Sequence, residues 1–306
     1  MKLQHCHLPV GNFGDDLNPL LWRETFGPMT RAPASVELWG VGTLLQNLPD
    51  SGAPKLVLGT GGGAKTRKPG SSLWDIRWVR GPMTAARLGL PKKKGLGDSA
   101  ILWSGLQDPT GPNVQGPVGL VPHWKTARDF DWTPLARETG LMVIDPTQTP
   151  AQVTEQLKQC SRVITESLHG AIFSDTLGIP WAPVVLSHRF NQFKWLDWLA
   201  TIDREFQPFI MDRPQVASQD LCKSMGNRLM RGLGWSFKSF RPHLRPVRAA
   251  SPEDIRQVTR QLRGFASESS RYTHSSMKKI HEQRQRMLEA CEKAAADYGV
   301  AFLKAR

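Results

Sequence analysis

One stretch, residues 163–180 (VITESLHGAIFSDTLGIP), constrains the fold of this chain more than any other. It opens with a β-branched run at residues 163–165, which is typical of a buried parallel strand. After a short turn, residues 171–177 are predicted to form a helix that Gly178 caps and Pro180 ends. A buried strand that leads directly into a helix favours an α/β fold with a parallel sheet.

The turn of this stretch carries polar groups at the point where the strand ends. Glu166, Ser167 and His169 lie there, together with Leu168 and Gly170. Ligands of open α/β sheets bind at the carboxyl ends of the strands, and helix N-termini attract anions. Glu166 and His169 are therefore candidate site residues. The alternative is that His169 only caps the helix or bonds to the backbone.

Composition indicates an ordinary globular protein. The chain has 306 residues, of which 40% are hydrophobic and 22% charged, and this length is enough for two α/β domains.

The four cysteines are widely spaced and form no CxxC pair, which argues against a disulfide framework and a structural zinc site. Residues 5–7 (HCH) would point to alternating faces of a strand, so we predict no metal site there.

The N-terminal residues lack the long apolar core of a signal peptide, and no run approaches the roughly 20 apolar residues of a membrane span. We therefore expect a cytoplasmic protein, either free or peripheral at the inner face of the membrane. The net charge of +13 predicts an anionic partner, such as a phosphorylated substrate, a lipid head-group surface or nucleic acid. Nothing matches a nucleic-acid-binding module, so nucleic acid is disfavoured.

The first half of the chain contains two glycine-rich loops that follow predicted strands. Residues 11–19 (GNFGDDLNP) follow a strand over residues 2–10 and precede a helix that should begin at Leu20. Asp15 or Asp16 is expected either to cap that helix or to lie in a cleft as a base. Asn12 belongs to the same loop.

The second loop, residues 59–66 (GTGGGAKT), follows the predicted strand 55–58 and nearly spells a phosphate-binding P-loop. Ala64 stands where that motif needs its last glycine, and residues 67–70 (RKPG) would break the following helix. We therefore do not predict a nucleotide P-loop. The repeated glycines still allow backbone N–H groups to approach a ligand closely.

Cationic and imidazole side chains also follow predicted strands. Arg80 ends the strand that starts at Trp74, and arginine suits bidentate binding of carboxylate or phosphate. His123 and Lys125 follow the strand 118–122 in the same way.

Residues 107–117 (QDPTGPNVQGP) have the composition of a linker. We therefore expect two Rossmann-like parallel-sheet domains that face a cleft, residues 1–115 and 116–207. Residues 208–306 are expected to form a basic helical extension, with helices from Ser251 to about Gly264 and from Ser275 to about Tyr298.

Five motifs then occur in order along the chain: residues 11–19 (GNFGDDLNP), 79–84 (VRGPMT), 121–124 (VPHW), 166–172 (ESLHGAI) and 193–198 (FKWLDW). Together they resemble the polysaccharide pyruvyl transferase family, and more narrowly its succinoglycan-type exopolysaccharide ketal pyruvyltransferases. The resemblance covers about residues 1–205.

The resemblance implies a fold like the two-domain GT-B glycosyltransferases and an enzyme that uses phosphoenolpyruvate as its donor. The product would be a pyruvate ketal on two hydroxyls of a sugar, in a polysaccharide or its lipid-linked precursor, with release of phosphate. Neither a metal nor a cofactor is implied. The acceptor is expected on the N-terminal domain and the donor on the C-terminal one.

The resemblance places the family's donor-site histidine on His169. Ketal formation needs a general acid and a general base, and we assign His169 as acid or phosphate ligand and Asp15 or Glu166 as base. Some members carry Arg where this chain has Ser167, so other cations must neutralise the donor. The predicted binding residues are Asn12, Asp16, Arg80, His123, Lys125, Ser167, Leu168, Gly170 and Lys194.

Two other functions fit the same pattern less well. One is a GT-B-type glycosyltransferase that uses a nucleotide sugar, which would share the cleft and the basic surface. The other is a non-catalytic protein that binds anions or nucleic acid through its charge. A non-catalytic binding function leaves the histidine, the carboxylates and the arginine at the strand ends without a role.

Overall fold

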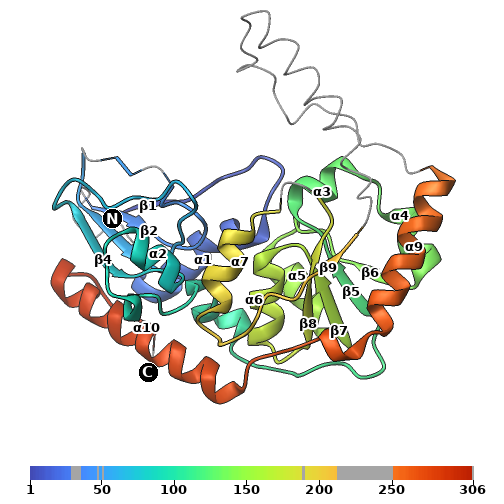
Figure 1. Cartoon of the computed structure of the whole chain (residues 1–306). Coiled ribbons are helices and arrows are strands. Elements are labelled where there is room, and N and C mark those ends of the chain that lie inside the picture. The colour runs from blue at the N-terminus through green and yellow to red at the C-terminus, as the bar shows by residue number, and fades with distance from the viewer. Residues whose placement is uncertain (29–35, 47, 50–51, 188–189, 212–250, 305–306) are drawn as a thin grey trace, which may run out of the picture.

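The computed structural model describes residues 1–28, 36–46, 48–49, 52–187, 190–211 and 251–304, which contain two parallel β-sheets with helices packed around them (Figure 1). The first sheet has the order β1-β2-β3-β4, and its strands are β1 (Lys2–Gln4), β2 (Glu37–Trp39), β3 (Lys55–Leu58) and β4 (Trp74–Trp78). The second has the order β6-β5-β7-β8-β9, with strands β5 (Val118–Val121), β6 (Met142–Val143), β7 (Arg162–Thr165), β8 (Trp181–Val185) and β9 (Phe209–Ile210). All pairings are parallel, so within each sheet the carboxyl ends of the strands lie at one edge.

The helix that follows β1 differs from the prediction. The strand stops at Gln4, and α1 (Phe13–Phe26) begins seven residues before Leu20. Asn12 occupies the N-cap position, so the prediction that Asp15 or Asp16 caps this helix is wrong. The carboxylate of Asp16 instead accepts the backbone N–H of Asn12 at 2.7 Å, which supplies the acceptor that the first turn needs.

A proline inside α1 explains why its start was placed too late. Pro19 has no N–H to donate to the carbonyl of Asp15, one turn earlier. The side-chain amide of Asn18 donates to that carbonyl at 2.9 Å and replaces the missing bond. The helix therefore continues through the proline.

The remaining helices of the first half are short. They are α2 (Pro82–Arg87) and the 3-10 helices η2 (Lys92–Lys94), η3 (Ser99–Leu102) and η4 (Ser104–Leu106).

The helices of the second half are α3 (Trp124–Asp129), α4 (Thr133–Thr139), α5 (Pro150–Lys158), α6 (Leu168–Thr176) and α7 (Gln192–Leu199). Thr149 and Gln152 cap α5 reciprocally. The central helix α6 begins at Leu168, three residues earlier than expected, because the hydroxyl of Ser167 accepts the N–H of Gly170. His169 therefore belongs to the first turn of α6.

The two helices near the C-terminus, α9 (Pro252–Ser267) and α10 (Met277–Tyr298), cover different sheets (Figure 1). α9 packs on α4 beside the second sheet, whereas α10 runs along the first sheet and contacts β4 and η3. Both helices agree with the predicted ranges. The basic residues of 212–250 lie outside the described part of the chain, and the domain boundaries at 115 and 207 stay predictions.

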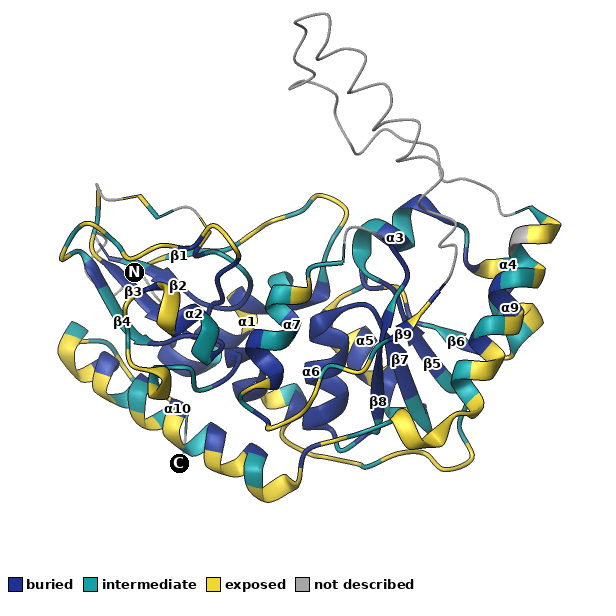
Figure 2. Ribbon diagram, viewed as in Figure 1, coloured by how far each residue is buried: buried dark blue, intermediate teal, exposed yellow. Residues whose placement is uncertain are grey.

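The two sheets share one continuous hydrophobic core (Figure 2). It joins Phe13 and Leu17 of α1 to Ile172 and Phe173 of α6, and the rings of Phe13 and Phe173 meet edge to face at 5.0 Å. Among the helices of the described residues, none is both long and apolar enough to cross a bilayer.

Arg284 of α10 attaches that helix to the segment beneath the first sheet. Its Nε donates to the carbonyl of Ile101 at 2.7 Å, and a terminal nitrogen donates to the carbonyl of Leu106 at 2.6 Å. Both carbonyls lie at ends of 3-10 helices, where no helical donor reaches them. Burial lowers the pKa of the guanidinium, which remains charged.

We expect Arg284→Met to destabilise the protein by about 2 kcal/mol, because two carbonyls lose charge-assisted hydrogen bonds. Chemical denaturation monitored by tryptophan fluorescence measures the change. Arg286→Met is the control: Arg286 makes a single long hydrogen bond on the exposed face of the same helix, so its loss should cost under about 0.5 kcal/mol. Equal stability of the two variants would contradict this role for Arg284.

Candidate active site

A cavity of about 300 Å³ lies between segments of the two sheets, beyond the carboxyl ends of β1, β4, β5, β7 and β8. Residues of the first half that line it are Cys6, Asn12, Asp15, Gly42, Thr43, Leu44 and Arg80. Those of the second half are His123, Trp124, Lys125, Glu166, Ser167, Leu168, His169, Ser187, Phe190, Asn191 and Lys194. The cavity therefore combines carboxylates, cations and imidazoles from loops that are far apart in sequence.

The structure brings ten of the twelve predicted site residues to this cavity. Asp16 and Gly170 do not line it. Asp16 holds the N–H of Asn12, and a Cβ added to Gly170 would lie 2.4 Å from Oγ1 of Thr165, so this glycine allows α6 to pack against its own strand. The chemical roles of the ten stay predictions.

His169 lies on α6 with its ring packed against the start of α1. It is 9% exposed, and its Nε2 lies 3.7 Å from a carboxylate oxygen of Asp98. A Cβ added to Gly14 would lie only 1.7 Å from Nδ1 of His169, so the ring fits there because residue 14 is glycine. Phe13 meets the ring edge to face at 6.3 Å.

Asp15 faces the same cavity from the first turn of α1. Its Oδ2 accepts the side-chain amide of Asn12 at 2.7 Å. Burial raises the pKa of the Asp15 carboxyl, and this effect exceeds the opposing ones of His169, the Asn12 hydrogen bond and Lys194. A half-buried carboxylate with a raised pKa is suited to accept a proton.

Glu166 is more completely engaged than Asp15. Its Oε2 accepts the backbone N–H of His123 at 2.9 Å, and its Oε1 accepts the hydroxyl of Ser187 at 2.9 Å. Burial raises its pKa, although these hydrogen bonds and a further one from Thr126 act in the opposite direction. Because both oxygens hold neighbouring segments in place, the geometry favours Asp15 over Glu166 as the group that is free to react.

Arg80 lies in the cavity wall, where most of its donors are used by the protein itself. One terminal nitrogen donates to the carbonyl of Gly42 at 3.2 Å and to the hydroxyl of Thr43 at 3.1 Å. A Cβ on Gly61 would lie 2.2 Å from the guanidinium carbon, so the glycine-rich loop 59–63 wraps closely around this side chain. The loop whose glycines were expected to allow close approach to a ligand thus lies against Arg80.

Arg80 is also joined to α7 through Asp197, a residue of the last predicted motif. The carboxylate of Asp197 is 0% exposed and accepts the backbone N–H and the hydroxyl of Thr84 at 2.9 and 2.6 Å. Its Oδ2 lies 3.8 Å from Nε of Arg80. Asp197 therefore fixes α7, which lies between β8 and β9 of the second sheet in sequence, on α2 of the first half.

Lys194 projects from this fixed helix into the cavity. Burial lowers the pKa of its ammonium group to about 8, helped by the charge of Arg80 and opposed by Asp15 and Glu166. Lys194 makes no hydrogen bond within the described part of the chain. Among the predicted cations it is thus better placed than Arg80 to meet an anion.

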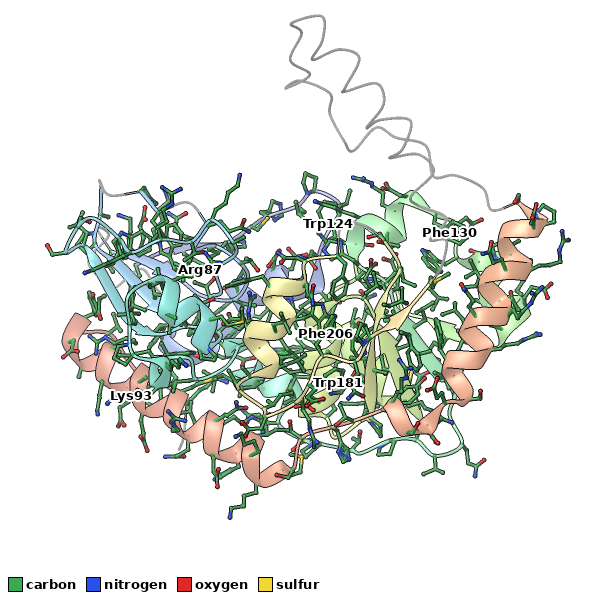
Figure 3. The ribbon with its side chains drawn as sticks, viewed as in Figure 1. Arg87, Lys93, Trp124, Phe130, Trp181 and Phe206 are labelled. Atoms are coloured by element: carbon green, nitrogen blue, oxygen red, sulfur yellow. The ribbon has the colours of Figure 1, made fainter. Side chains whose placement is uncertain are left out.

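Sequence reasoning did not single out several residues around the cavity, namely Thr43, Trp124, Ser187, Phe190, Asn191, Asp98 and Asp197. Trp124 at the start of α3 (Figure 3) lies beside His123, and the cations of Lys125 and Arg128 lie over its ring at 5.2 and 5.6 Å. Asp197 lay within a quoted motif, whereas Asp98 gave no signal beyond a carboxylate in a loop. Over the described ranges, no three or more His, Cys, Asp or Glu residues are placed to hold a metal ion.

We expect Gly14→Ala to destabilise the protein by about 2 kcal/mol, because the new methyl group would overlap the ring of His169. Thermal unfolding of the purified variant measures the loss. Gly264→Ala in α9 is the matched control, since its Cβ meets no atom within 4 Å and alanine favours the helix by up to about 1 kcal/mol. Unchanged stability of Gly14→Ala would mean that the ring does not pack there.

Comparisons with known proteins give a family model, one curated relative and one solved structure. The sequence model described as polysaccharide pyruvyl transferase matches residues 71–188. The succinoglycan biosynthesis protein ExoV of Rhizobium meliloti (strain 1021) is 36% identical over 211 residues, which is 68% of this chain and 67% of that protein. A solved structure, "Structure of the Wall Teichoic Acid Polymerase TagF, H548A", aligns over 85% of this chain and 74% of its own, with 11% identity and a TM-score of 0.33, too low to support an argument.

Proposed function

Because the chain belongs to the polysaccharide pyruvyl transferase family, we propose that it transfers a pyruvyl group from phosphoenolpyruvate to a sugar and so forms a pyruvate ketal. The proposal extends the family assignment to the donor and to the chemistry of the product. The cavity, in which Asp15, His169 and Lys194 meet, is the proposed active site.

One observation carries the proposal: a single cavity holds three cationic side chains beside a histidine and a carboxylate with a raised pKa. Phosphoenolpyruvate carries a carboxylate and a phosphate, and its pocket needs cations and N–H donors. Lys194 and Lys125 supply charge, and α6 directs its first N–H groups toward the same cavity.

The acid–base groups fit the steps of ketal formation. His169 as an imidazolium would protonate the methylene carbon of the donor, which leaves positive charge on the neighbouring carbon. Asp15 would take the proton of the first sugar hydroxyl as its oxygen attacks that carbon. The second hydroxyl then displaces phosphate, and its proton leaves with the phosphate group.

Two further expectations belong to this proposal. The two sheets would act as the two halves of a GT-B-like architecture, with the acceptor sugar held by the loops of the first half. The acceptor would be a polysaccharide unit or its lipid-linked precursor, which the positive net charge of +13 would help to recruit at an anionic membrane surface.

Thermal unfolding with phosphoenolpyruvate and, separately, with nucleotide sugars tests the donor. Phosphoenolpyruvate at 100 times its Kd should stabilise the protein by about 2.7 kcal/mol, and nucleotide sugars should give no shift. With an acceptor oligosaccharide, His169→Ala should lower phosphate release at least about 100-fold while its unfolding without ligand remains cooperative. A shift with uridine or guanosine diphosphate sugars alone would replace the proposal with a glycosyltransferase.

The lowered pKa of Lys194 predicts how donor binding depends on pH. Below pH 8 the ammonium is charged and attracts the anionic donor, and above about 8 the charge is lost, so affinity should fall as pH rises. The phosphate of the donor is fully ionised above about pH 7, so between pH 7 and 9.5 it contributes no change of its own. Calorimetric titration over this range measures Kd.

Lys194→Met should weaken binding about 10- to 100-fold at pH 7 and remove the rise in Kd above pH 8. Lys92→Met, in the exposed η2 helix, is the control and should match the wild type. The same Kd in Lys194→Met and wild type at every pH would exclude Lys194 from the donor site.

A further inference from the structure

A carboxylate oxygen of Asp98 that has no hydrogen-bond partner among the described residues lies near Nε2 of His169. The other ring nitrogen, Nδ1, lies beside Gly14 of α1. The side chain of Asp98 is 0% exposed, and its Oδ1 accepts the N–H of Ala100 at 3.1 Å, which caps η3. Its Oδ2 has no hydrogen-bond partner among the described residues, and neither has Nε2 of His169, although both atoms are buried. The two atoms lie 3.7 Å apart.

Two buried polar atoms without partners are costly when they are considered separately. Each such group loses its hydrogen bonds to water on burial and gains none in the protein. A separation of 3.7 Å is longer than a hydrogen bond, yet catalytic hydrogen bonds are often long without substrate and tighten in the complex. The geometry therefore points to a hydrogen bond between Nε2 and Asp98 that closes when the cavity is occupied.

We infer that Asp98 is the positioning residue of His169: it accepts the Nε2 proton, fixes the orientation of the ring and stabilises the imidazolium. Nδ1, the other ring nitrogen of this cavity-lining residue, is then the nitrogen that gives its proton to the substrate. This inference rests on the proposed function, in which His169 is the general acid.

The proton balance of the reaction explains why such a partner is needed. The Nδ1 proton goes to the methylene carbon of the donor, and the electron pair of the C=C bond forms the new C–H bond. His169 is left neutral with its proton on Nε2, facing Asp98. The proton of the first hydroxyl passes to Asp15, the second leaves with phosphate, and proton transfer from Asp15 to His169 restores the starting state.

The segment that carries Asp98 is held firmly enough for this task. The hydroxyl of Ser99 donates to the carbonyl of Leu58 in β3 at 2.6 Å, and Arg284 of α10 holds the carbonyl of Ile101. Met287 of α10 packs against Gly97, where an added Cβ would lie 2.8 Å from its methyl carbon. Asp98 therefore approaches His169 from a fixed position.

The charged groups that act on the ring come from three elements. Asp98 lies before η3, Asp15 lies in the first turn of α1, and Lys194 of α7 interacts with Asp15. A test must separate the effect of Asp98 from that of Asp15, which belongs to the proposed catalytic machinery.

Asp98→Asn tests the inference in the full chain. The amide oxygen can keep the bond to Ala100, so the fold should persist, while the amide nitrogen would now donate to Nε2 and move the ring proton to Nδ1. We expect ¹⁵N spectra of labelled histidine to show that change of tautomer, with the titration midpoint of the ring shifted to lower pH. In the transfer assay kcat should fall about 100-fold, with less than a threefold change in KM.

Asp131→Asn is the matched control, because Asp131 accepts an N–H two residues later in the same way, but in a solvent-exposed hydrogen bond outside the cavity. It should leave both the spectra and kcat unchanged. The wild type provides a test that needs no variant: the neutral form of its His169 ring should carry the proton on Nε2. A proton on Nδ1, or identical His169 spectra in Asp98→Asn and wild type, would overturn the inference.

The outcomes also separate this inference from the proposed function. If the wild type binds no phosphoenolpyruvate and transfers no pyruvyl group, the proposed function fails, whereas the spectra still report on the pairing of Asp98 with His169. If transfer occurs and the spectra of Asp98→Asn match those of the wild type, the function stands and the role of Asp98 is rejected.

Discussion

The arrangement of the molecule depends on the buried carboxylate of Asp197, which joins segments 113 residues apart in sequence. Removing such a charge from water costs several kcal/mol unless charge and hydrogen bonds compensate. Here Thr84 donates twice and Arg80 supplies the opposite charge. Gly81 permits this contact, because its Cβ would lie 2.0 Å from the backbone oxygen of Asp197. Through this one side chain, α7 is fixed on the first half and Lys194 reaches the cavity.

The burial of the charged cavity residues lowers the stability of the fold, although the same burial gives them the pKa values that the proposed chemistry uses. Burial raises the pKa values of Asp15 and Glu166 and lowers that of Lys194, so each of these groups opposes folding at neutral pH in its charged form. The surrounding network compensates: Glu166 holds two loops, and Arg80 donates to the carbonyls of Gly62, in the glycine-rich loop, and Gly42. Reactive groups are thus held by neighbours whose own role is structural.

The sequence predicts most of this fold because parallel strands and their helices have strong local signals. The strands at residues 55–58, 118–121 and 162–165 appear close to where the β-branched runs place them, and ten predicted site residues share one cavity because they follow strand ends. The start of α1 is not predicted because the side-chain amide of Asn18 supplies the hydrogen bond to Asp15 that Pro19 cannot make. A sequence pattern does not show that this one side chain takes over the bond. Asp98 is not predicted because its carboxylate oxygen comes within 3.7 Å of Nε2 of His169 only in the folded structure. The spacing of these two residues along the sequence does not indicate that contact.

The position of α10 has a consequence for how the chain folds during synthesis. The strands of the first sheet are made early, yet the helix that covers β4 and η3 comes from residues 277–298. Contacts that close such long stretches of chain form late, since their loop entropy must be overcome before they stabilise anything. The apolar face that α10 covers therefore stays open to water until residues 277–298 have left the ribosome, and exposed apolar surface of this kind favours aggregation of a nascent chain.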